Sequence, residues 1–190
     1  MRLYAITVRR WWAVLLAIIA LIAVCWSLGA TEVPVPSLIG GMTGARLAYF
    51  TPLFVVVATL YCLERRLPHV ENAAVVGITR LDLSVVLLVV LGAHAAGLIV
   101  GMDIARNITL LLSLALLIRR LTNEAAAATA GLMCLIASLM LGRTYQPGGE
   151  AGYAWWALPL YPADSIAAWL AATAFLTVVT GLGLAGRSRY

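Results

Sequence analysis

Six long apolar runs constrain what this chain can fold into more than any other feature. They cover residues 11–28, 47–63, 83–102, 104–118, 125–142 and 166–184. A helix needs about 20 apolar residues to cross the hydrocarbon core of a bilayer, and the runs are close to that length. Because 63% of the residues are hydrophobic and 11% are charged, a soluble globule would lack the polar side chains to cover its surface. The sequence therefore predicts an all-α, polytopic membrane protein with six transmembrane helices in a single domain.

The first and fourth runs differ from the other four. The first follows Arg9 and Arg10 and has the length of a signal peptide, but no small-residue cleavage site precedes a soluble domain, so we expect it to be retained. The fourth is short and carries Arg106 near its start, which makes it the weakest of the set. Either a tight turn separates it from the third run, or the two form a shallow hairpin.

The arginines orient the runs, because loops rich in basic residues stay in the cytoplasm. With a cytoplasmic N-terminus, ten of the thirteen arginines lie inside, and Arg46, Arg106 and Arg143 lie outside. The acidic residues divide equally between the two sides. We therefore expect a protein of the bacterial cell membrane with both termini in the cytoplasm. Nucleic-acid binding is not expected, because the arginines stand at the ends of apolar runs and not on a broad polar face.

Two outer connections are long. Residues 29–46 are rich in Gly and Pro, which predicts an ordered but non-helical connection. Residues 143–165 hold several aromatic side chains between prolines, including Tyr153, Trp155 and Trp156. Aromatic rings of this kind favour the membrane–water interface, so we expect interfacial or re-entrant packing on the outer face.

Catalytic and metal-binding patterns are missing from the sequence. It contains no Gly-x-Ser-x-Gly, no His-Glu-x-x-His and no run of spaced aspartates of the kind that holds magnesium. Cys25, Cys62 and Cys134 stand inside apolar runs without a partner at ligand spacing. We therefore expect no catalytic residue, no metal site and no cofactor bound by this chain.

Three polar residues fall within or beside the spans: His94, Asp103 and Arg106. A charge at the bilayer centre is costly, so such residues suggest function. For His94 the structural alternative is a neutral ring hydrogen-bonded to a neighbouring helix. For Asp103 and Arg106 the alternatives are a mutual ion pair that lowers the cost of burial and a solvated pair that caps a hairpin. Arg119, Arg120 and Glu124 are most simply a stop signal on the cytoplasmic side.

Residues 63–83 form a charged interruption between the second and third runs. The segment predicts a cytoplasmic amphipathic helix that Pro68 can start, because Val70, Ala74, Ile78 and Leu81 share one helical face. Such a helix either lies flat on the inner leaflet or contacts a protein. Charges of both signs suit a protein partner better than an anionic lipid surface.

The layout resembles the permease subunits of type-2 ABC exporters. The quoted stretches LERRLPHVENAAVVGITRLDLS (63–84), ARN (105–107) and WWALPLYPADSIAAW (155–169) are similar to segments of small actinobacterial permeases of that class. The resemblance implies that the charged segment docks onto a cytoplasmic ABC ATPase. The coupling surface that it implies consists of Glu64, Arg65, Arg66, Glu71, Asn72, Arg80 and Asp82.

The same resemblance implies the remaining partners. No Walker motif occurs in the chain, so ATP and Mg²⁺ belong to a separate ATPase subunit. A second copy of the permease, or a related one, completes the transporter, and membrane lipid surrounds it. The expected cargo is amphipathic or hydrophobic. The alternative is an accessory or scaffold subunit of a larger membrane complex that transports nothing itself.

Overall fold

The computed structural model describes residues 11–37, 41–64, 78–145 and 151–185. These residues form helices, two short 3₁₀ turns and two β-hairpins, so the predicted helical class is confirmed. The helices are α2 Trp12–Leu28, α3 Pro52–Glu64, α5 Ile78–Val100, α6 Met102–Leu121, α7 Glu124–Leu141 and α8 Ile166–Ala185. Each coincides with one of the apolar runs. The predicted cytoplasmic helix from Pro68 falls largely on residues 65–77, which lie outside the described residues.

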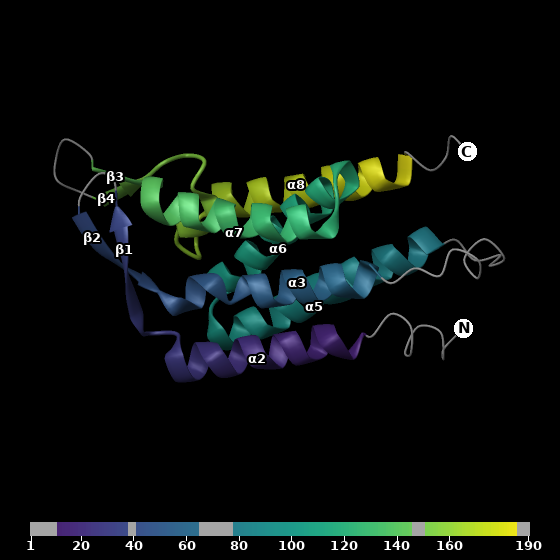
Figure 1. Ribbon diagram of the computed structural model, residues 1–190, viewed down its shortest axis with the longest axis horizontal. Coiled ribbons are helices and arrows are strands. Elements are labelled where there is room, and N and C mark those ends of the chain that lie inside the picture. The colour runs from purple at the N-terminus through teal and green to yellow at the C-terminus, as the bar shows by residue number, and fades with distance from the viewer. Residues whose placement is uncertain (1–10, 38–40, 65–77, 146–150, 186–190) are drawn as a thin grey trace.

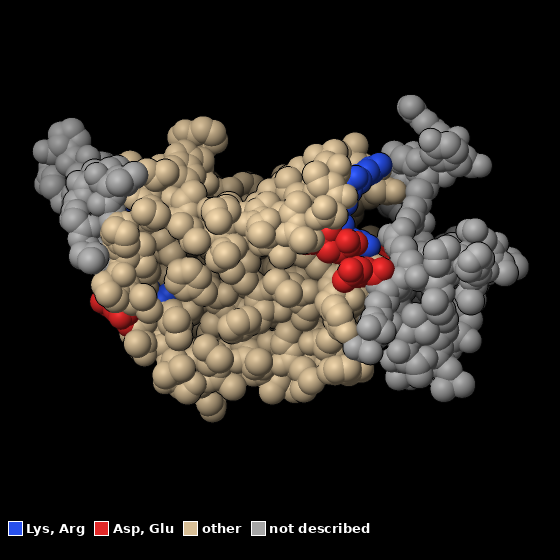
Figure 2. Space-filling model, viewed as in Figure 1, with Lys and Arg blue, Asp and Glu red and all other residues tan. Residues whose placement is uncertain are grey.

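Four described helical segments are long and apolar enough to cross a membrane: Leu47–Glu64, Asp82–Val100, Glu124–Leu141 and Ile166–Gly183. The helix α2 is apolar but somewhat shorter, with 17 residues. The helices lie side by side along the long axis of the molecule (Figure 1). On the face seen in Figure 2, charged side chains gather at the two ends of the bundle, and a broad uncharged band separates them.

The chain reverses direction from each helix to the next (Figure 1). Both β-hairpins lie at one end, which we call the hairpin end: β1 Glu32–Ser37 with β2 Gly41–Arg46, and β3 Arg143–Tyr145 with β4 Ala151–Tyr153. The opposite end, which we call the α6–α7 end, holds Thr122 and Asn123 between those helices. The start of α2, the end of α3, the start of α5 and the end of α8 also lie there (Figure 1).

The helix α6 is the centre of the bundle. It packs against α3, α5, α7 and α8, and every residue from Ile104 to Ser113 is buried. The fourth run, residues 104–118, forms a regular helix of 20 residues, but α6 is not among the described segments apolar enough to cross a membrane, in line with the expected weakness of this span. A helix enclosed by protein can carry polar side chains when their groups are bonded. Accordingly, the hydroxyls of Thr109 and Ser113 donate to carbonyls one turn earlier, at 2.9 and 2.7 Å.

A tight turn joins α5 to α6, which selects the first of the two predicted alternatives. Gly101 alone separates the helices, and its φ of 133° is a backbone conformation that favours glycine. Close approach also requires Gly97, because a Cβ there would stand 2.7 Å from the Cβ of Ala105.

The hairpin end has its own small apolar cluster, built from Ala45, Leu139, Ala157 and Leu160 with partly buried neighbours. The described residues of the Gly- and Pro-rich connection, 29–37 and 41–46, are non-helical, as predicted. They form the β1–β2 hairpin, which η1 (Leu47–Phe50) joins to α3. The connection from α7 to α8 repeats this order, with a hairpin followed by η2 (Leu158–Leu160). Arg143 links the two hairpins by donating to the carbonyl of Gly44 at 3.0 Å.

Replacing Gly97 by alanine tests the α5–α6 contact. We expect Gly97→Ala to lower the free energy of unfolding by about 1–3 kcal/mol, because the new Cβ overlaps the buried Ala105. Gly181→Ala is the matched control, since nothing lies within 4 Å of a Cβ built there, and alanine is the better helix former. Thermal unfolding in detergent compares the two, and equal midpoints would contradict the packing.

Candidate functional site

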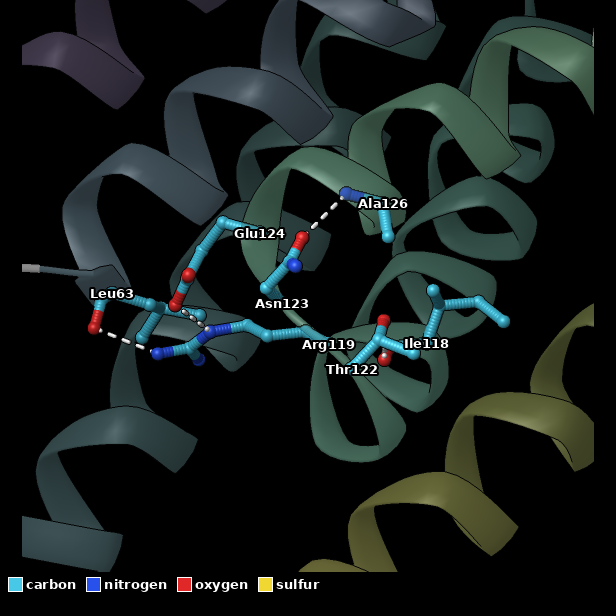
Figure 3. A network of polar contacts seen from close by, with 7 residues as sticks. All are labelled: Leu63, Ile118, Arg119, Thr122, Asn123, Glu124 and Ala126. Carbon is cyan, nitrogen blue, oxygen red and sulfur yellow. Dashed lines mark hydrogen bonds and ion pairs between the residues drawn. The ribbon is translucent and has the colours of Figure 1, made fainter.

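Arg119 lies in the last turn of α6 and binds groups from two other helices (Figure 3). Its Nε donates to Oε1 of Glu124, the first residue of α7, at 3.0 Å. Its Nη2 donates to the backbone carbonyl of Leu63, near the end of α3, at 2.9 Å. The Arg119 side chain is 14% exposed and that of Glu124 is 34% exposed. We call these bonds the Arg119 contact.

The Arg119 contact places a positive charge where α3 needs one. The last carbonyls of a helix have no partner within the helix, and the helix dipole makes that end negative. Next to the contact, the side chain of Asn123 caps α7 by accepting from the Ala126 amide at 2.8 Å (Figure 3). The contact therefore joins the ends of α3, α6 and α7.

The interpretation of Arg119, Arg120 and Glu124 as merely a stop signal is incomplete. Arg120 is exposed, as that interpretation expects, whereas Arg119 makes a tertiary contact. Its partner Leu63 is 56 residues away in the sequence, and no local pattern relates the two.

Leu63, the acceptor in the Arg119 contact, directly precedes Glu64, the first residue of the predicted coupling surface. Glu64 is the exposed last residue of α3, and Asp82 lies half-buried near the start of α5. Arg80 belongs to the first turn of α5. The other members, Arg65, Arg66, Glu71 and Asn72, lie outside the described residues.

Arg106, at the other end of α6, is 1% exposed. Its Nη1 donates to the carbonyl of Pro162 at 2.8 Å, and its Nη2 donates to that of Tyr161 at 2.7 Å. The side chain of Asn107 accepts from Arg106 Nη2 at 3.1 Å, and its own Nδ2 donates to the Pro159 carbonyl at 3.0 Å. We call these bonds the Arg106 contact. Two of the quoted sequence stretches, 105–107 and 155–169, therefore meet here.

The predicted solvated pair of Asp103 and Arg106 is wrong, and in the described part of the chain the two residues form no ion pair. The reason is geometric, because the planar guanidinium presents its N–H groups as a fork that fits several carbonyls of one tight turn. Burial of this charge is tolerated because its donors are bonded. Arg106 therefore supports the fold, and its nitrogens already have partners within the chain.

His94 also differs from its prediction. Its Nδ1 lies 2.8 Å from the carbonyl oxygen of Val90 on the same helix, not on a neighbouring one. Because a carbonyl can only accept, Nδ1 carries the proton. The ring instead meets α8 through Trp169, with centroids 5.5 Å apart and planes inclined by 41°. Among the described residues, no group of three or more His, Cys, Asp or Glu side chains could hold a metal ion.

No family model, curated protein or solved structure matches this chain. The fold itself defines the class: a mostly helical protein with four described segments able to cross a membrane, consistent with a place in a membrane. Its most developed polar sites are the contacts that Arg106 and Arg119 make at the two ends of α6.

Removing the Arg106 guanidinium tests the first of these sites. We expect Arg106→Leu to lower the free energy of unfolding by about 2–4 kcal/mol, because the carbonyls of Tyr161 and Pro162 lose their guanidinium donors in a partly buried place. Arg106→Lys should recover a small part, since an ammonium cannot reproduce the fork.

Arg143→Leu is the control for this experiment. Arg143 also donates to a carbonyl across the hairpin end, but in an exposed position. Its replacement should change the unfolding midpoint in detergent little. Equal losses in the Arg106 and Arg143 variants would show that the Arg106 contact does not hold the fold.

Proposed function

We propose that this chain is the transmembrane subunit of an ATP-driven, ABC-type exporter. All six helices would span the membrane, with the α6–α7 end in the cytoplasm. The alternating direction of the helices supports this orientation. The helix ends that adjoin the arginine-rich parts of the sequence all lie at the α6–α7 end, and arginine-rich loops stay in the cytoplasm. The proposal places residues 64–82 at the same end as the Arg119 contact.

The Arg119 contact is the observation on which the proposal chiefly rests. It fixes the carbonyl of Leu63, directly before the charged segment, to the central helix and to α7. A force applied to that segment is therefore transmitted to α6, which packs against four other helices. Coupling between distant sites needs such a continuous set of packed and bonded groups.

The proposed mechanism divides the chemistry between two chains. A separate ATPase binds ATP and Mg²⁺, and the charged segment docks onto it through residues of both signs, which favours a specific partner. At the hairpin end, the Arg106 contact and the small apolar cluster fill the space between the helices of one chain. Cargo would therefore pass between two permease subunits by alternating access. Large apolar side chains exposed on α2, α5 and α8 suit an amphipathic or hydrophobic cargo.

Co-purification tests the docking directly. A tagged chain, extracted in mild detergent from its native host, should retain an ATPase with Walker motifs. Glu71→Arg and Arg80→Glu should each remove that ATPase by reversing a charge on the docking surface. Arg46→Glu reverses an exposed charge at the hairpin end and should leave the complex intact. Purification with other membrane proteins but no ATPase would contradict the proposal and favour an accessory subunit.

Arg119 provides a separate test of transmission. We expect Arg119→Met to retain the ATPase but to lower transport per ATP hydrolysed by at least about fivefold, the lower end of typical coupling energies. The exposed neighbour, changed as Arg120→Met, should behave like the wild type. Reconstituted vesicles with the purified complex allow both rates to be measured. Full transport by the Arg119 variant would contradict this role.

A further inference from the structure

Three helices, α2, α5 and α8, carry most of the large apolar side chains that the described part of the bundle exposes. On each helix, the first and the last of these side chains stand 16 residues apart in the sequence. With a rise of 1.5 Å per residue, each exposed apolar stretch is about 24 Å long. We call the three stretches together the apolar band: Trp12 to Leu28, Leu83 to Ile99, and Ile166 to Leu182.

Contacts between the helices place the three stretches at a similar depth in the bundle. Ile18 of α2 lies against Gly92 of α5, since a Cβ built at Gly92 would stand 2.8 Å from Cδ1 of Ile18. Two residues further along α5, His94 meets Trp169 of α8. The apolar band is therefore a common property of the three helices, and it agrees with the broad uncharged region between the two ends of the molecule in Figure 2.

Polar and aromatic residues mark where the apolar band ends. Asp82 directly precedes Leu83, and the exposed Asp164 stands two residues before Ile166. On α2, the rings of Trp12 and Trp26 are 52% and 78% exposed near the two ends of the helix. Exposed tryptophans favour the boundary between headgroups and hydrocarbon. These residues limit the length of the surface that suits hydrocarbon.

The apolar band is shorter than an ordinary bilayer is thick. A typical hydrocarbon core measures about 30 Å, which is about 6 Å more than the band. Tilting the helices cannot close this gap, because tilt reduces the thickness that a helix of given length spans. We propose that the apolar band fits a bilayer of lipids with short acyl chains, and that the protein thins a thicker bilayer around itself. The inference requires only that the bundle crosses a membrane, and it does not depend on the proposed transport function.

Reconstitution of the full chain into phosphatidylcholines that differ only in acyl-chain length tests this fit. The series runs from dimyristoleoyl through dipalmitoleoyl and dioleoyl to dierucoyl lipid. We expect the thermal unfolding midpoint, followed by circular dichroism, to be highest in one of the two shorter lipids and to fall by several degrees towards the longest, because the cost of mismatch grows with its size. A highest midpoint in either longer lipid would overturn the proposal. Equal midpoints in all four would also overturn it, since something other than lipid would then cover the band.

Lengthening the apolar band at the hairpin end provides a matched comparison. Thr31 and Asp164 are both exposed, next to the ends of α2 and α8. The double variant Thr31→Leu, Asp164→Leu should move the highest midpoint to a lipid with longer chains. The control Thr31→Ser, Asp164→Asn keeps both positions polar and should retain the wild-type order of lipids. Because lipids are compared within each variant, a general loss of stability does not affect the result. An unchanged order in the leucine variant would overturn the proposal, since the length of the band would not set the preferred thickness.

Discussion

The hydrogen bonds of the Arg106 guanidinium govern the arrangement of the bundle. An arginine with 1% exposure in apolar surroundings is stable only if its N–H groups are bonded. The carbonyls of Pro159, Tyr161 and Pro162 meet this need, and they can do so only if the connection from α7 to α8 folds over the start of α6. That requirement places α7 and α8 against α6, while α3 and α5 pack against it as well.

The sequence predicts the helices well, because their apolar length is a local property. It predicts the position of α6 poorly, for a physical reason. Apolar content measures suitability for lipid, whereas α6 is surrounded by protein and carries Arg106, Asn107, Thr109 and Ser113 in buried places. The run that is least suited to lipid is therefore the most central helix of the bundle.

The two contacts made by arginines could not be predicted from the sequence either. Arg106 binds carbonyls 53 to 56 residues further along the chain, and Arg119 binds one 56 residues earlier. Both acceptors are backbone groups, which every residue possesses, so the sequence carries no signal for them. Asp103, only three residues from Arg106, is the more obvious partner by residue type, but a turn with several carbonyls satisfies the guanidinium more fully.

These contacts bind both ends of α6. Arg106 holds the chain between α7 and α8 at the hairpin end, and Arg119 holds Leu63, directly before Glu64, at the other end. Labelling of the reconstituted protein with a carbene reagent dissolved in the bilayer tests this central placement most directly. If α6 is enclosed, residues 104–113 should remain unlabelled, while the exposed side chains of α8, such as Leu170 and Val178, are labelled. Labelling of α6 to the same extent as α8 would contradict the arrangement.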